Sequence, residues 1–182
     1  AGESSDLAMI IAVTDPALGK RGITAFITPT DNPGYEVVRK EDKLGHRTND
    51  TCEIRFNDMR VAASDVLGEV GRGLSIALAN LSLGRIGVAA QATGGARAAL
   101  EAARQYARER ETFGKKIGEH QAIAFKLADM ATKIEAARQL YLHAADMRDR
   151  DLQCSTEASM AKLFASEMAE QVASQALQIH GG

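Results

Sequence analysis

The stretch ERETFGKKIGEHQ, residues 109–121, separates two long alanine-rich segments and so decides the arrangement of the second half of the chain. Its two glycines, Gly114 and Gly118, are residues that end helices, and Gly114 is well placed as the residue after a helix C-cap. The segments on either side carry apolar residues spaced by three and four, which is the period of an α-helix buried along one side. Two such helices joined by a short connection pack antiparallel. The stretch therefore predicts a corner of a helical bundle.

The helical period predicts three long helices. The first opens after GEVGRG, residues 68–73, the second covers about 119–150 and the third about 155–179. The predicted core positions of the second and third helices are Ile123, Leu127, Met130, Ile134, Ala137, Tyr141, Ala144, Ala161, Phe164, Met168, Val172 and Ala176. A glycine inside a helix costs about 1 kcal/mol relative to alanine. Another backbone or a ligand is therefore expected close to the four glycines of the first helix, which are Gly84, Gly87, Gly94 and Gly95.

Residues 7–61 have a different period. Short β-rich runs such as LAMIIAV and ITAFITP alternate with turn residues, and Cys52, Ile54 and Phe56 alternate with polar neighbours. Alternation with period two is typical of a half-buried strand. The pattern predicts three or four antiparallel strands, and the fold class is therefore α+β, with the strands first and the helical bundle second.

Composition excludes several classes of protein. The chain has 182 residues, 45% hydrophobic content and a formal net charge of −2, so no overall charge attracts it to nucleic acid or to an anionic membrane. Its two cysteines, Cys52 and Cys154, lie about a hundred residues apart, which fits neither a metal site nor a disulfide framework. No apolar run approaches the roughly 18 residues of a membrane span. The chain begins without methionine and stops at a glycine pair, so we expect it to be part of a longer protein.

Two short segments have residues that turn chemistry alone does not explain. Arg110, Thr112 and Phe113 combine a guanidinium, a hydroxyl and an aromatic ring, which match a phosphate joined to a flat heterocycle. The terminal QIHGG, residues 178–182, is either a plain helix C-cap or a glycine backbone that a ligand approaches closely. At this level both segments remain either turns or anion-binding corners. The four histidines show no metal-ligand spacing, so no metal is predicted, and no serine lies in a nucleophile motif.

Five segments together resemble the acyl-CoA dehydrogenase family in order and spacing. They are KLGHRTNDTCEIRFNDMRV (43–61), LGEVGRGLSIAL (67–78), LGRIGVAAQATGGARAALEAA, YARERETFGKKIGEHQAIAFKLADMATKIEAARQL and EASMAKLFASEMAEQVASQALQIHGG. The resemblance runs nearly end to end. It implies that residues 1–67 are the second half of an antiparallel, β-barrel-like middle domain. It likewise implies that residues 68–182 are most of a C-terminal, up-and-down four-helix bundle.

The resemblance also implies an activity. Members of the family use FAD to oxidise an acyl-CoA thioester to a trans-2-enoyl-CoA, as in fatty acid β-oxidation, and pass the electrons to an electron-transfer flavoprotein. They are homotetramers in which neighbouring subunits share the FAD site. The expected location is the cytoplasm of a bacterium or the mitochondrial matrix of a eukaryote. Neither nucleic acid nor membrane is an expected partner.

Individual positions follow from the family motifs. The RxxFG motif falls on Arg110, Phe113 and Gly114, with Arg110 expected on the FAD pyrophosphate and Phe113 near the adenine end. The other expected FAD contacts are Gln121, Gln178, Gly181 and Gly182. The acyl-CoA side resembles LDxGR and implies Ser82, Gly84 and Arg85, with Ser82 standing where short-chain members often have aspartate.

No catalytic base is assigned within this chain. Most of the family carries a base glutamate well beyond the glycine pair, so it is expected after Gly182; one branch carries it next to the helix arginine, where this chain has Gly84. Two other functions stay open on the residues alone. One is an acyl-CoA oxidase that uses oxygen, and the other is a helical assembly module without catalytic activity.

Overall fold

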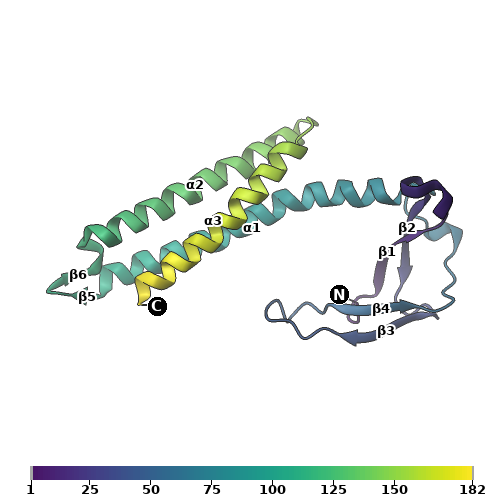
Figure 1. Cartoon of the computed structure of the whole chain (residues 1–182), viewed down its shortest axis with the longest axis horizontal. Helices are drawn as coiled ribbons and strands as arrows, with labels where there is room; N and C mark the ends of the chain where they lie inside the picture. The colour runs from purple at the N-terminus through teal and green to yellow at the C-terminus, as the bar shows by residue number, and fades with distance from the viewer. Residues whose placement is uncertain (1, 182) are drawn as a thin grey trace. The chain divides into compact units, whose positions relative to one another are not determined.

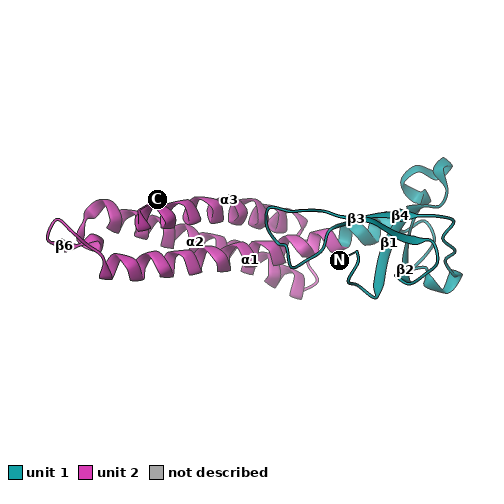
Figure 2. Cartoon of the chain, turned by 90° about the horizontal axis from the view of Figure 1, so that it is seen from below, with its two compact units in different colours: residues 1–79 teal, residues 80–182 magenta. Residues whose placement is uncertain are grey.

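The computed structural model describes residues 2–181 and divides the chain into two compact units, Ala1–Ala79 and Asn80–Gly182 (Figure 2). Each unit is described by itself. The domain boundary expected between residues 67 and 68 stays a prediction.

The first unit contains two antiparallel strand pairs. Strand β1 (Leu7–Val13) pairs with β2 (Ile23–Pro29), and strand β3 (Tyr35–Lys40) pairs with β4 (Cys52–Phe56) (Figure 1). A 3-10 helix, η1 (Pro16–Gly22), connects β1 to β2, and a second one, η2 (Ala63–Asp65), follows β4. The prediction of three or four antiparallel strands is thus confirmed with four, and in the described residues they form two separate two-stranded sheets.

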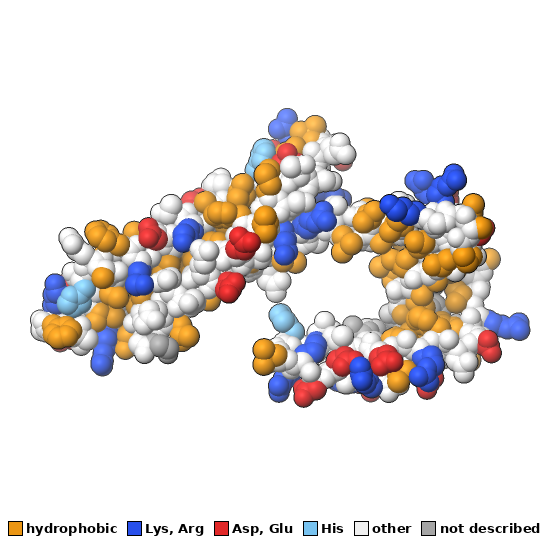
Figure 3. Space-filling view, in the orientation of Figure 1, with side chains coloured by type: hydrophobic (Ala, Val, Ile, Leu, Met, Phe, Trp, Pro, Cys, Tyr) orange, Lys and Arg blue, Asp and Glu red, His pale blue; other side chains and the backbone are white. Residues whose placement is uncertain are grey.

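Most of the buried side chains in this unit lie on β2. Thr24, Ala25 and Thr28 of β2 are fully buried, whereas β1 exposes four large apolar side chains, namely Leu7, Met9, Ile11 and Val13. Figure 3 shows apolar side chains gathered over these two strands. In the second sheet, Tyr35 and Phe56 are cross-strand partners whose rings meet edge to face at 5.9 Å. Phe56 was predicted on the buried side of a half-buried strand, but 49% of its surface is exposed.

The second unit is an up-and-down bundle built from three helices in the described residues. They are α1 (Gly73–Glu109), α2 (Gln121–Asp149) and α3 (Ser155–His180), and α1 begins within the first unit. A short hairpin, β5 (Glu111–Thr112) with β6 (Lys115–Lys116), and the 3-10 helix η3 (Ile117–Glu119) connect α1 to α2 (Figure 1). The predicted fold class, antiparallel strands followed by an antiparallel helical bundle, is confirmed.

Alanine dominates the core of the bundle. Helix α1 buries Ala89, Ala96 and Ala103, a seven-residue repeat that keeps one side of the helix against its neighbours. Of the predicted core positions, the buried ones are Met130, Ile134, Ala137, Ala144, Ala161, Met168, Val172 and Ala176. Phe164 is 38% exposed, so its predicted core position is wrong. On α3 the buried positions on either side of Phe164 are Ala161, which was predicted, and Ala165, which was not.

One expectation about α1 is wrong, and a second is not met within the described chain. An 18-residue window of α1 has a mean hydropathy of 1.4, so by length and composition alone this helix could cross a bilayer. The earlier expectation failed because alanine and glycine are apolar enough to extend the run between its few charges. In addition, no atom of the described residues lies within 4 Å of a Cβ built on any of the four helix glycines. The described chain itself therefore does not supply the close approach that these glycines predict.

Candidate functional site

The corner between α1 and α2 is a β-hairpin rather than a simple helix cap. Helix α1 ends at Glu109, and Thr112 pairs with Lys115 across a two-residue turn. The turn residues Phe113 and Gly114 have φ angles of 53° and 78°, the left-handed values that a tight hairpin turn of the primed kind requires. The assignment of Gly114 as the residue after the C-cap of α1 is therefore wrong, because the helix stops five residues before it.

Phe113 combines a strained backbone conformation with an exposed side chain. An aromatic residue at positive φ is strained, since its Cβ crowds the backbone in the left-handed region. Its ring is 97% exposed, so burial in the described chain does not offset the strain. An exposed ring in a strained turn is a common feature of ligand-binding positions.

Contacts of one charged side chain, Lys116, connect the segments of the hairpin. Lys116 forms an ion pair with Glu111 at 2.6 Å and donates a hydrogen bond to the Glu109 carbonyl at 3.2 Å. The hydrogen bond from Lys116 lowers the pKa of Glu111 below its ordinary value. Lys116 is therefore part of the polar contacts of the hairpin. Because Lys116 already neutralises Glu111, that carboxylate competes less for the neighbouring Arg110.

Arg110 begins the hairpin and differs from Lys116 in its contacts. Its backbone N–H donates to the Tyr106 carbonyl at 2.9 Å, which continues the turn of α1 by one residue. Its exposed guanidinium forms no hydrogen bond or ion pair with residues 2–181. An unpaired guanidinium next to an exposed aromatic ring fits a phosphate joined to a flat ring system.

His120 ties the hairpin to the start of α2. It occupies the N-cap position of α2, yet its side chain makes no cap bond there. Instead its Nε2 lies 3.3 Å from the Thr112 hydroxyl, and its ring meets Phe113 edge to face at 6.4 Å. Gly118 lies so close to α1 that an added Cβ would be 3.1 Å from the Ala107 carbonyl oxygen. These contacts place Gln121, the next predicted site residue, beside the hairpin.

The end of α3 lies at the same end of the bundle. Gly181 caps the helix with a φ of 108°, and its N–H donates to the Gln178 carbonyl at 3.2 Å. The His180 ring stacks on the ring of Tyr106, with centroids 4.6 Å apart and planes at 27°. Figure 1 shows this end of α3 near the β5–β6 corner. Gly182, also a predicted cofactor contact, lies outside the described residues.

The structure thus brings most of the predicted cofactor positions together. Arg110, Phe113 and Gln121 come from one segment, Gln178 and Gly181 come from another about 60 residues later, and both segments lie at one end of the bundle. Sequence reasoning missed Tyr106 and His120, whose contacts with His180 and Thr112 hold these segments. An aromatic residue four positions before Arg110 and a histidine at a helix N-cap were the available signals.

The predicted substrate positions do not join this cluster. Ser82, Gly84 and Arg85 lie near the other end of α1, where Leu78 and Leu81 are also exposed. Arg85 is 24 positions before Glu109, which corresponds to about 36 Å along a helix that rises 1.5 Å per residue. The predicted acyl-CoA positions and the predicted FAD positions are therefore well separated along α1.

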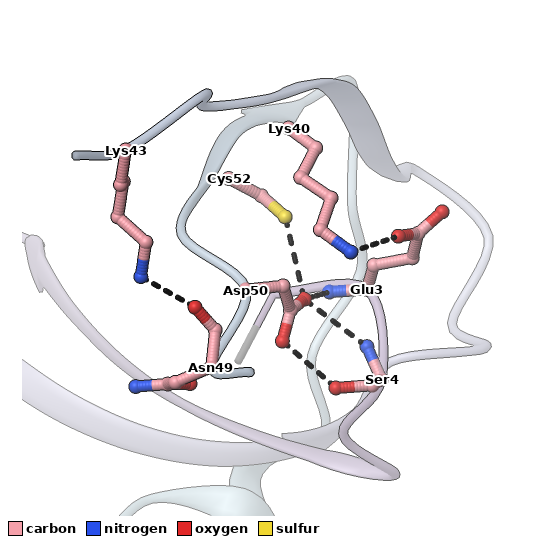
Figure 4. Close-up of polar contacts among 7 residues, drawn as sticks. All are labelled: Glu3, Ser4, Lys40, Lys43, Asn49, Asp50 and Cys52. Atoms are coloured by element: carbon pink, nitrogen blue, oxygen red, sulfur yellow. Dashed lines mark hydrogen bonds and ion pairs between the residues drawn. The ribbon is translucent and has the colours of Figure 1, made fainter. Parts of the chain in front are cut away.

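A second polar cluster surrounds Asp50 in the first unit (Figure 4). The buried Asp50 carboxylate accepts hydrogen bonds from the Glu3 backbone N–H at 2.6 Å, the Ser4 hydroxyl at 2.8 Å and the Cys52 thiol at 3.4 Å. The Glu3 bond is the main reason that the pKa of Asp50 lies far below its usual range. Burial, followed by the carboxylate itself, raises the pKa of the Cys52 thiol. The chain satisfies this cluster internally, which indicates a structural role.

One groove of the second unit does not resemble an active site. A groove of about 190 Å³ between α2 and α3 is bridged by hydrogen bonds from Lys126 to Gln175, at 2.6 Å, and from Lys133 to Gln171, at 3.1 Å. Its lysines are thus already used in holding two helices together. Residues 2–181 contain no group of three or more potential metal ligands.

Comparison with known proteins identifies relatives over the whole chain. Residues 71–182 match the family described as "Acyl-CoA dehydrogenase, C-terminal domain", and residues 1–59 match "Acyl-CoA dehydrogenase, middle domain". The chain is 50% identical over 181 residues to an acyl-CoA dehydrogenase of Bacillus subtilis, covering 100% of this chain and 48% of that protein. It spans about half the length of the curated relatives it matches.

Solved structures give the same result. Butyryl-CoA dehydrogenase from Megasphaera elsdenii is 45% identical with a TM-score of 0.95, and the match covers 100% of this chain and 47% of that one. A structure described as PigA with FAD and proline is 30% identical with a TM-score of 0.95, over 100% of this chain and 47% of that one.

Proposed function

The chain belongs to the acyl-CoA dehydrogenase family, and from this membership we propose that it is the part of an FAD-dependent acyl-CoA dehydrogenase that holds the cofactor between subunits. The supporting observation is that the hairpin with Arg110 and Phe113 and the end of α3 with Gln178 lie at one end of the bundle, joined by the Tyr106–His180 stack, with the Arg110 guanidinium unpaired among the described residues. The substrate class is an acyl-CoA thioester and the product a trans-2-enoyl-CoA.

The residues at the hairpin end bind the cofactor rather than perform chemistry. Arg110 binds the FAD pyrophosphate through charge-assisted hydrogen bonds, and the Phe113 ring covers the adenine end. Gln121, Gln178 and the Gly181–Gly182 backbone complete this part of the site. When bound, FAD supplies the hydride acceptor for the β-hydrogen of the acyl group, which no protein side chain can supply.

The substrate is expected at the opposite end of α1. There Arg85, Ser82 and Gly84 contact the acyl-CoA, and the small Gly84 lets it approach the helix. Removal of the α-proton requires a base, and no residue in this chain is assigned that role. We expect a glutamate later in the full-length protein to perform it.

The family resemblance favours a shared site and an oligomer. In the proposed arrangement Arg110, at the hairpin end of α1, binds the FAD of a neighbouring subunit, while Arg85, well before it on the same helix, contacts the acyl-CoA in the site of its own subunit. A homotetramer in which the hairpin end reaches the FAD of a neighbouring subunit provides this arrangement. The electrons leave through an electron-transfer flavoprotein, in the cytoplasm of a bacterium or the mitochondrial matrix of a eukaryote.

Anaerobic titration of the full-length protein tests the proposal. The purified protein should be yellow, and its flavin absorbance should bleach when butyryl-CoA, the substrate named for the Megasphaera relative, is added. A protein that purifies as a colourless tetramer and cannot take up FAD would contradict the proposal and favour an assembly module. Peroxide formation in air without another acceptor would instead indicate an acyl-CoA oxidase.

A further inference from the structure

We infer that Tyr106 and His180 form a positioning pair that sets the β5–β6 hairpin and the end of α3 at a fixed distance from each other. The inference rests on the proposed function, because it assigns the pair to the FAD site. Neither ring is proposed to contact the cofactor. Their role is to hold two separate cofactor-binding segments in register.

The geometry of Tyr106 connects it to both segments. Its carbonyl accepts the N–H of Arg110 at 2.9 Å, so its backbone fixes the residue that begins the hairpin. Its ring, partly buried against the bundle core, stacks on His180 with centroids 4.6 Å apart. One residue of α1 therefore contacts the first segment through its backbone and the second through its side chain.

A hydrogen bond within α3 fixes the orientation of the His180 ring. Its Nδ1 donates to the Ala176 carbonyl at 2.8 Å, since a carbonyl can only accept, and this bond fixes the plane of the ring. The residue lies two positions after Gln178 and directly before Gly181, which ends the helix. A shift of the His180 ring would consequently move both of these predicted FAD contacts.

The ring pair adds a directional contact to the surrounding packing. Near this end α1 contributes the small core residues Ala103 and Ala107, and α3 contributes Ala176 and the larger Ile179, whose aliphatic contacts are not directional. In the described part of the chain, Tyr106 with His180 is the only stacked pair of rings. Offset stacking contributes about 0.5–1.5 kcal/mol beyond burial and is directional. Two binding segments fixed before FAD arrives lose less conformational freedom on binding.

A double-mutant cycle in the full-length protein tests the pair. The variants are Tyr106→Leu, His180→Leu, the combination of both, and Tyr106→Phe, each measured by FAD affinity after removal and re-addition of the cofactor. Each leucine variant should raise the Kd for FAD about three- to tenfold. The combination should raise it no more than the larger single change, because both remove the same contact. Tyr106→Phe keeps the stack and should stay within about twofold of the wild type.

Tyr141→Leu is the matched control, since Tyr141 packs against the same core from α2. It should lower the unfolding temperature of the FAD-free protein and leave the Kd for FAD unchanged, which separates positioning from general stability. Additive effects of the two leucine variants, or an equal loss of affinity in Tyr141→Leu, would overturn the pair while leaving the proposed function intact. A wild-type protein that binds no FAD would overturn both.

Discussion

The Asp50 cluster and the β5–β6 hairpin differ in whether the chain itself satisfies their polar groups. Around Asp50, backbone, hydroxyl and thiol donors all point to one buried carboxylate. At the hairpin, Lys116 neutralises Glu111, yet the described chain leaves Arg110 unpaired and Phe113 strained and exposed. The first arrangement holds the chain to itself, and the second is ready to hold something else. The unpaired guanidinium and the exposed ring, rather than polar groups in general, therefore distinguish the proposed binding site.

The strongest test of this contrast is Arg110→Ala in the full-length protein. Losing charge-assisted hydrogen bonds to a pyrophosphate should raise the Kd for FAD about 10- to 100-fold. The unfolding temperature of the FAD-free protein should stay unchanged, because the described chain does not use this guanidinium. Isothermal titration and thermal unfolding measure the two quantities.

Arg108→Ala is the matched control for Arg110, since Arg108 is an exposed arginine in the last turn of α1. It should change neither the Kd nor the unfolding temperature. Equal losses of affinity in both variants would mean that only general positive charge attracts the cofactor.

The opposite result is expected for Asp50→Ala. Removing the carboxylate leaves the Glu3 and Ser4 donors without their acceptor, so the first unit should unfold at a lower temperature. The Kd for FAD at the hairpin should not change. Asp42→Ala, which removes an exposed carboxylate from the same β3–β4 connection, is the control and should have no effect on unfolding.

The contribution of the Asp50 carboxylate to stability should also depend on pH. The pKa of Asp50 is lowered on folding, so its stabilisation is complete above the unfolded value of about 3.9 and is lost as pH falls toward the folded value. The difference in unfolding temperature between the wild type and Asp50→Asn should therefore be constant near neutral pH and shrink below about pH 4. A difference that grows on acidification would contradict the hydrogen-bonding account.

Phe113→Gly should separate stability from binding by changing them in opposite directions. Glycine adopts positive φ freely, so the substitution should relieve about 1 kcal/mol of strain in the hairpin. Losing the ring should raise the Kd for FAD about threefold. Calorimetry on the FAD-free and FAD-bound protein measures both.

His46→Gly is the control for strain alone. His46 has a φ of 52° in the first unit and is exposed, so its replacement should give a similar gain in stability without any change in FAD affinity. If Phe113→Gly leaves the affinity unchanged, the exposed ring has no part in binding.

Glu111→Gln should have the smallest effect. The exposed ion pair with Lys116 is screened by water, so its loss should increase amide hydrogen exchange at Thr112 and Lys116 only slightly. Because folding lowers the pKa of Glu111, the contribution of the pair is present at neutral pH and fades on acidification through that lowered value. Glu101→Gln, which removes the Arg97 pair on α1, should leave exchange at the hairpin unchanged.

The helices and most of their core could be predicted from the sequence because their period is local. Residues such as Met130, Ile134 and Val172 repeat at helical spacing and are buried as expected. The hairpin strands could not be predicted, since two-residue strands carry no period and Gly114 fits a helix cap equally well. The partner of the helix glycines was not predictable either, because nothing within the described chain approaches them.

The candidate site likewise contains residues that motifs predict and residues that only tertiary contacts reveal. Arg110, Phe113, Gln121 and Gln178 were named from their motifs, and the structure brings them to one end of the bundle, while their roles stay predictions. Tyr106 and His120 act through contacts that no motif describes. The stack of Tyr106 on His180 joins residues 74 positions apart (180 − 106), and only tertiary structure can reveal such a pair.

The 37-residue length of α1 has a genetic consequence. If each helix serves one active site with Arg85 and another with Arg110, then defects at these two positions disable different sites of the assembly. Two inactive alleles, one altered at each position, should therefore restore partial activity when expressed in the same cell, because some mixed sites receive both intact arginines. Two alleles altered at the same position should not.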